Sequence, residues 1–105
     1  ASRPRGEFTR WMKGRELPRL TAHTVIDARR FRAVIDEVRQ QDWCVASEEH
    51  ELGVHALALP LRNMEGHTVA AMNVVASRQR LESRVLQKDL LPLMLEAARE
   101  LRPLL

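Results

Sequence analysis

Two neighbouring apolar segments joined by a short turn constrain the fold most strongly. Val54–Arg62 and residues 66–76 each alternate side chains between two faces, as β-strands do, and Gly66 suits the positive φ of a hairpin turn. Both faces of both segments are largely apolar, which predicts that the sheet is covered on both sides. A third, shorter strand pattern at residues 43–47 completes a predicted three-stranded antiparallel sheet.

Helical patterns flank these strands. The carboxylate of Asp27 can accept hydrogen bonds from the free N–H groups of a first helical turn, and residues 28–41 then repeat apolar side chains at helical spacing. A short helix at 7–13, a short β-rich segment at 21–26 and a long C-terminal helix, kinked or restarted at Pro92, are also expected. The order of elements predicts an α+β fold. In the helix at 28–41 the apolar stripe is Phe31, Val34, Ile35 and Val38, and the opposite, solvated face carries Arg29, Arg32, Asp36, Arg39 and Gln40.

Length and composition indicate one globular domain. The chain has 105 residues, 45% of them apolar and 30% charged, and no apolar run reaches the roughly 18–20 residues of a membrane span. Cys44 has no second cysteine to pair with, so a reducing, cytoplasmic location and no membrane association are expected. Because the chain starts at Ala1 rather than methionine, we expect it to be a piece of a longer protein.

Positive charge is concentrated at the start of the chain. The first 40 residues hold ten Lys and Arg against five Asp and Glu. Basic clusters of this kind can bind nucleic acid, because they release counterions from phosphates. Neither interleaved aromatic residues nor a groove-reading helix accompanies the charge, so a solvated helical face is the favoured interpretation.

Groups able to carry catalysis are few and poorly arranged. The run Glu48, Glu49 and His50 could supply acid–base groups or metal ligands, and Cys44 could supply a nucleophile. No HExxH or paired spacing accompanies the run, and no neighbouring base or cation accompanies Cys44, which is expected to be a small buried apolar residue. Glycine-rich phosphate loops are also absent. The sequence therefore predicts no catalytic residue, metal or cofactor.

A binding pocket is the more plausible kind of site. Asn73 is the one polar side chain in the apolar run 69–75, and a buried amide must find a hydrogen-bond partner in the fold or in a ligand. The small residues Ala56, Ala58 and Ala71 belong to the same region, where they either allow a helix to approach or leave a cavity. Two other functions stay open: a small enzyme, and a structural oligomerisation domain whose interface is the leucine-rich C-terminal helix.

Several segments in order carry a resemblance to a known family. The chain resembles the effector-binding domain of IclR-type bacterial transcription regulators from about residue 7 to its end, and is most similar to the Pca/Pob branch, which regulates aromatic-acid breakdown. No single segment is specific, but the ordered set with its spacings is. The segments are residues 20–27, 48–54, 58–62, Gly66, 69–74, 91–92 and 96–98.

The resemblance implies a fold, partners and an incomplete domain. It implies a GAF-like antiparallel sheet with flanking helices that binds a small organic or aromatic acid, in a protein that forms dimers or tetramers and controls a catabolic operon. DNA is bound in this family by an N-terminal winged helix-turn-helix, which these 105 residues do not include. Residues 1–105 correspond to the later portion of one effector-binding domain whose N-terminal strands are missing, so we expect an unpaired sheet edge that pairs with another chain or with preceding residues.

The resemblance also places the ligand-binding residues. Carried over position by position, they are Ala46, Val54, Ala56, Asn73 and Val75. Members that bind small acids have an aspartate at the position of Ala46, a cysteine at that of Ala56 and a polar residue at that of Val75. Only Asn73 keeps a polar group here, which favours a larger, partly apolar or aromatic acid over a glyoxylate-like one.

Overall fold

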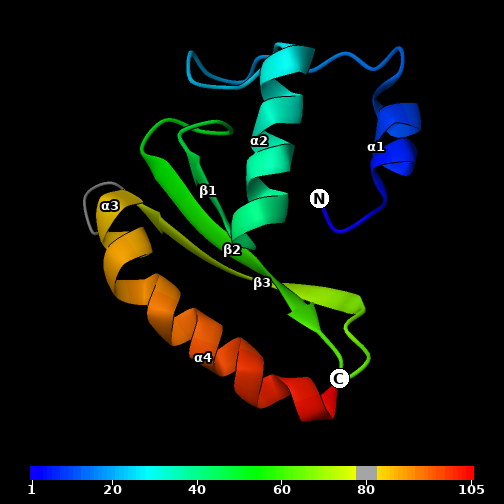
Figure 1. The fold of residues 1–105 in the computed structure, drawn as a ribbon. Helices are drawn as coiled ribbons and strands as arrows, with labels where there is room; N and C mark the ends of the chain where they lie inside the picture. The colour runs from blue at the N-terminus through cyan, green and yellow to red at the C-terminus, as the bar shows by residue number, and fades with distance from the viewer. Residues whose placement is uncertain (78–82) are drawn as a thin grey trace.

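The computed structural model describes residues 1–77 and 83–105 and contains one antiparallel sheet. Its strands are β1 (Cys44–Ser47), β2 (Val54–Arg62) and β3 (Thr68–Ser77), in the order β1-β2-β3 (Figure 1). Gly66, with a φ of 85°, lies in the turn between β2 and β3. The predicted three-stranded sheet is confirmed, with small shifts in the ends of two strands.

One face of the sheet packs against the helix α4 (Leu91–Leu101), which runs along it in Figure 1. Alternate side chains of β2 point to this face, and Leu57 has no exposed surface. Because period-two alternation places every second residue on one side, β2 supplies a continuous apolar row to the helix. The core cluster is Leu57, Leu59, Leu61, Leu91 and Met94.

The C-terminal helical region is interrupted, as Pro92 predicts. It consists of α3 (Ser83–Val85), the π-helical turn η1 (Leu86–Leu90), α4 and the 3₁₀ turn η2 (Arg102–Leu104). Pro92 lies in the first turn of α4, where a residue without an N–H group removes no helical hydrogen bond. None of the helices in the described part of the chain has the length and apolar character needed to cross a membrane.

The helix α2 (Ala28–Gln41) has the predicted bounds. Asp27 caps it, since its Oδ1 accepts from the N–H groups of Arg29 at 2.7 Å and Arg30 at 3.2 Å. Asp42 ends the helix in the left-handed region with a φ of 67°, and its N–H donates to the carbonyl of Val38. Local sequence signals therefore determine both ends of this helix.

The cap of α2 leads to a stability prediction. We expect Asp27→Ala to lower the free energy of unfolding by about 1 kcal/mol, because two N–H groups of the first turn lose their acceptor. Asp27→Asn keeps a side-chain oxygen at the same position and is the matched control, with an expected loss of a few tenths of a kcal/mol. Urea unfolding of the two variants tests this; equal losses would contradict a capping role.

The helix α1 (Arg5–Met12) lies beside α2 and away from the sheet (Figure 1). Its aromatic side chains contact α2: the ring centroids of Phe8 and Trp11 lie 6.1 and 6.3 Å from that of Phe31. Met12 is buried at the end of α1. Part of the apolar stripe of α2 therefore packs against α1.

Residues 21–26 do not form the predicted β-rich segment. They form a loop whose threonine hydroxyls bind the turn between β1 and β2: Thr21 Oγ1 donates to the carbonyl of Glu48, and Thr24 Oγ1 donates to that of Glu49. The N–H of Thr21 in turn donates to Thr24 Oγ1 at 2.9 Å. Polar contacts from a distant turn therefore override the β-propensity of this segment.

The prediction that both faces of the sheet are covered is wrong for the face opposite α4. Val75 is 61% exposed, and Asn73 and Ala71 are exposed beside it on β3. Asn73 is therefore not the buried amide that its apolar surroundings in the sequence predict. An apolar and partly uncovered sheet face is a place where another molecule or segment can bind.

Candidate functional site

The site is built on the sheet face that points away from α4, here called the open face. Its side chains come from alternate positions of the three strands, and the antiparallel register arranges them in rows. One row is Ala46, Ala56 and Val75, and the next is Cys44, Ala58 and Asn73. Pro60 and Ala71 form a third. Most of these side chains are small, so they rise only a short distance above the backbone of the open face.

The structure brings the five predicted ligand-binding residues onto this one face. Ala46, Ala56 and Val75 lie directly opposite one another across the three strands. Asn73 belongs to the next row, and Val54 lies at the start of β2, opposite Ser77. Their placement on one face follows from the strand register, and ligand binding by them stays a prediction.

A cavity of about 430 Å³ adjoins these residues at one end of the open face. The C-terminal half of α2, the strands and the first two residues of the chain line it, and it is open to solvent. None of the five predicted residues lines it, but Cys44 and Ala58 do, and both share a row with Asn73. The cavity therefore lies next to the row of Asn73 on the open face. Its other lining side chains include Val38, Arg39, Asp42, Pro60, Arg62 and Ala71.

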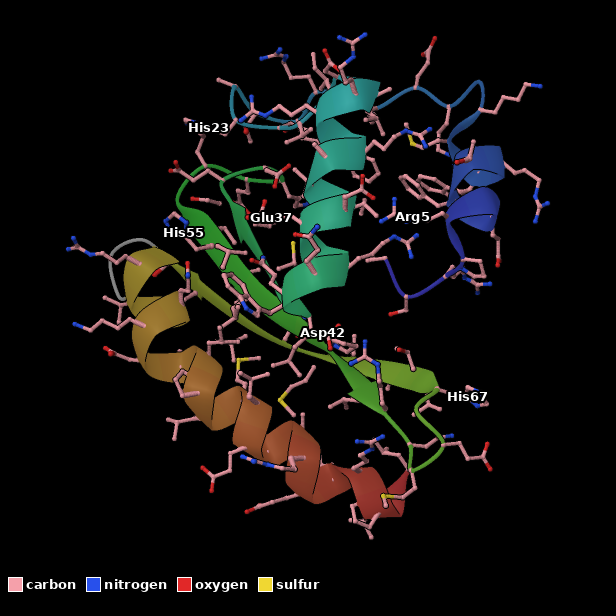
Figure 2. All side chains as sticks on the ribbon, viewed as in Figure 1. Arg5, His23, Glu37, Asp42, His55 and His67 are labelled. Atoms are coloured by element: carbon pink, nitrogen blue, oxygen red, sulfur yellow. The ribbon has the colours of Figure 1, made fainter. Side chains whose placement is uncertain are left out.

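An ion pair closes one side of the cavity. Arg62 donates to both carboxylate oxygens of Asp42, from Nη1 at 2.6 Å and from Nη2 at 2.7 Å. The hydrogen bond to Asp42 raises the pKa of Arg62. Figure 2 shows Asp42 where the end of α2 meets the sheet. The pair thus connects the end of α2 to the end of β2, and both of its charged groups are satisfied.

Arg39 is half-buried, and two of its guanidinium nitrogens have no hydrogen-bond partner in the described part of the chain. Its Nε and Nη2 atoms are shielded from solvent and have no hydrogen-bond acceptor among the described residues. It lines the same cavity from α2. The sequence pattern places Arg39 on the solvated face of the helix, and only the fold shows that this face meets a cavity here.

Two carboxylates of the acidic turn accept hydrogen bonds from backbone N–H groups. Glu48 Oε1 accepts from the N–H of Gly53 at 2.9 Å, and Glu49 Oε1 accepts from the N–H of Val25 at 3.2 Å. His50 is exposed. Among the described residues, no three His, Cys, Asp or Glu side chains are arranged to hold a metal ion. The turn therefore holds loops together.

Cys44 is half-buried on the open face rather than buried as predicted. Burial raises the pKa of its thiol, and the charges of Glu49 and Glu37 raise it further. A raised pKa leaves less thiolate at neutral pH, and the thiolate is the nucleophile. Cys44 is therefore unsuited to nucleophilic catalysis.

The histidines are spread over the molecule. His55 is 6% exposed on the face that meets α4, and its Nδ1 lies 2.8 Å from Ser47 Oγ. His23 and His67 lie at opposite ends of the structure (Figure 2). No two of them share the open face, so they cannot act together there. The open face itself carries small apolar residues and the amide of Asn73, and the guanidinium of Arg39 lies at its edge, which is the character of a binding surface.

Comparison with known proteins identifies a family of regulators. The family model for "Bacterial transcriptional regulator IclR C-terminal" matches residues 1–102. The Pca operon regulatory protein of Acinetobacter baylyi is 43% identical over 95 residues, which cover 90% of this chain and 34% of that protein. The p-hydroxybenzoate hydroxylase transcriptional activator of the same organism is 42% identical over 94 residues, covering 90% of this chain and 35% of that protein. The chain thus spans about a third of the length of these relatives.

A solved structure agrees in both fold and sequence. It is the inducer-binding domain of a double mutant of the transcription factor PobR from Acinetobacter, in complex with 3-hydroxybenzoic acid. The superposition has a TM-score of 0.92 at 40% identity and covers 98% of this chain and 59% of that one. These similarities confirm the α+β fold and the resemblance to the Pca/Pob branch. The chain belongs to the family of C-terminal domains of IclR-type bacterial transcriptional regulators.

Proposed function

We propose that this chain is the later portion of a ligand-sensing domain that binds an aromatic acid on its open face. The five residues Ala46, Val54, Ala56, Asn73 and Val75 form the surface for the ring. The observation that carries the proposal is their gathering on one partly uncovered sheet face beside a cavity of about 430 Å³. A solved relative in complex with 3-hydroxybenzoic acid supports the same ligand class.

The chemistry of the open face suits an aromatic acid better than a small polar one. Alanine and valine side chains leave space and offer apolar contact, and such contact favours a planar ring. Asn73 supplies the polar group that a ring hydroxyl can bind. Nothing in this arrangement requires a cofactor, and the raised pKa of the Cys44 thiol disfavours Cys44 as a nucleophile.

The proposed setting is a longer, cytoplasmic regulator. Its preceding residues would supply further strands, which fit the outer edge of β3, and a DNA-binding winged helix-turn-helix. Acid binding would favour one of two arrangements of a dimer or tetramer, and so change the spacing of the DNA-binding domains and the transcription of a catabolic operon. Differential affinity of the acid for the two arrangements is the required driving force.

A structural oligomerisation domain is the second candidate, and the outer side of α4 favours it. Leu93 is 62% exposed on the side of α4 away from the sheet, whereas Leu95, which is 43% exposed, lies on the flank of α4 beside Leu59 and Pro60. Exposed leucines on one helix are typical of a surface that another chain covers. Oligomerisation through α4 is compatible with sensing, so the two functions differ only in whether an acid binds.

A thermal-shift screen of the full-length protein with benzoate, 3-hydroxybenzoate, 4-hydroxybenzoate and protocatechuate tests the proposal. We expect at least one acid to raise the Tm by several degrees at a concentration about 100 times its Kd, because binding to the folded state alone adds roughly 2.7 kcal/mol. Cyclohexanol serves as an uncharged, non-aromatic control. An unchanged Tm with all four acids would favour the oligomerisation domain, and turnover of any of them would contradict the regulator.

A further inference from the structure

We infer that the ring of the acid lies over two rows of small side chains, and that Ala58, in the second row, determines which substituents the ring can carry. This inference rests on the proposed function and adds to it a residue that selects among aromatic acids. The five residues taken from the family resemblance do not include Ala58. Its place beside them follows from the register of the strands.

Ala58 is a direct neighbour of two predicted ligand-binding residues. It lies opposite Asn73 in the pairing of β2 with β3, and two positions beyond Ala56 on the same face of β2. Opposite residues lie about 5 Å apart, and two residues of a strand span roughly 7 Å. Ala56 and Asn73 are diagonal neighbours, so a ring that contacts both of them passes over the corner that Ala58 occupies.

Side-chain size favours the part of the open face formed by β1 and β2. Two adjacent rows there hold only alanine and cysteine, namely Ala46 with Ala56 and Cys44 with Ala58. On β3 the same rows end in the larger side chains of Val75 and Asn73, and both of these are exposed. A planar ring therefore has room over β1 and β2, and its edge on the β3 side meets the amide of Asn73.

The described fold leaves space beside the second row. Cys44 and Ala58 both line the cavity of about 430 Å³, whereas none of the five predicted residues does. A volume of this size lies within the range of small-molecule sites, and such sites are lined mainly by apolar groups. The five predicted residues mark one part of the surface for the ring, and the cavity shows that this surface continues into the second row.

The position of Ala58 relates it to one part of the ligand. When a ring hydroxyl binds Asn73, one of the two ring carbons beside that hydroxyl lies towards Ala58, because the two residues are opposite each other. The single methyl group of an alanine leaves space for a substituent on that carbon, and a branched side chain would fill it. Apolar sites discriminate one methylene group by roughly 10–200-fold, so position 58 can separate such acids.

The test compares two acids that differ only beside the hydroxyl. Isothermal titration calorimetry of the full-length protein uses 4-hydroxybenzoate and 4-hydroxy-3,5-dimethylbenzoate, whose two methyl groups ensure that no flip of the ring avoids position 58. We expect wild type to bind both acids. Ala58→Val should weaken binding of the dimethyl acid about tenfold or more, and binding of 4-hydroxybenzoate by less than about threefold.

A control variant and a ratio separate this effect from a change in folding. Ala33→Val adds the same volume at an exposed position of α2 and should leave both affinities unchanged. Valine suits a β-strand, so Ala58→Val should fold, and circular dichroism and the Tm without ligand check this. Partial unfolding would weaken both acids by the same factor, so the ratio of the two affinities is the informative quantity.

The outcomes distinguish the inference from the function beneath it. If wild type binds neither acid, the proposed function fails and the inference fails with it. If wild type binds 4-hydroxybenzoate but not the dimethyl acid, the sensor stands and the space assigned beside Ala58 does not exist. An unchanged ratio of the two affinities in Ala58→Val would likewise overturn the inference while the sensor stands, since position 58 would then not select the substituent.

Discussion

Leu57→Ala is expected to lower the free energy of unfolding by about 2–5 kcal/mol. Leu57 has no exposed surface and lies between β2 and α4, in contact with the core cluster that includes Leu91 and Met94. Removing its isopropyl group leaves a cavity that the rigid sheet can fill only in part. The loss is large compared with the 5–15 kcal/mol of a typical domain.

Urea unfolding followed by tryptophan fluorescence measures this loss. Trp43 packs against the core cluster and reports on it, and a Trp11→Phe background removes the second tryptophan. Leu52→Ala is the matched control, because Leu52 is 64% exposed and the same substitution there should cost less than about 0.5 kcal/mol. Similar losses at Leu57 and Leu52 would show that the contact between α4 and the sheet contributes little.

Ala56→Phe is expected to reduce the affinity for an aromatic acid about 100-fold, which corresponds to roughly 2.7 kcal/mol. Ala56 occupies the centre of its row on the open face, between Ala46 and Val75. A benzyl group there would occupy the space proposed for the ring of the ligand. Because Val75, its neighbour in the row, is 61% exposed, a larger side chain at position 56 can extend towards solvent, and the variant should fold with a Tm close to that of wild type.

Calorimetric titration with the acid that gives the largest thermal shift measures the effect of Ala56→Phe. Ala33→Phe adds the same volume at an exposed position of α2 and should leave the affinity unchanged. Full affinity in Ala56→Phe would place the acid away from the open face. Equal weakening in both variants would indicate a general effect of added bulk on the fold.

The sequence predicts those elements whose signals are local. The bounds of α2 are correct because Asp27 and the apolar stripe both lie within or beside the helix, and those of β2 are correct because alternation continues over nine residues. Pro92 correctly marks the restart of the last helix. The β-rich prediction for residues 21–26 is wrong because Thr21 and Thr24 bind the carbonyls of Glu48 and Glu49, about 25 residues away, and propensity carries no information about such contacts.

The site is less predictable than the fold. The resemblance names five residues, and register explains why they share a face, but alternation cannot tell which face of a sheet stays uncovered. Asn73 therefore looks buried in the sequence and is exposed in the structure. Arg39 shows the opposite error: on a helical wheel it is one solvated polar residue among several, but it is half-buried in the structure, where the end of α2 meets the sheet.

The π-helical turn η1 has a geometric consequence for everything that follows it. A π turn closes its hydrogen bond one residue later than an α turn, and one residue of an α-helix corresponds to a rotation of about 100°. Had the region stayed α-helical from Ser83, Leu91 and Met94 would lie about a quarter of a turn away from Leu57. The π turn therefore sets the rotation of α4 about its own axis, so that Leu91 and Met94 face the sheet.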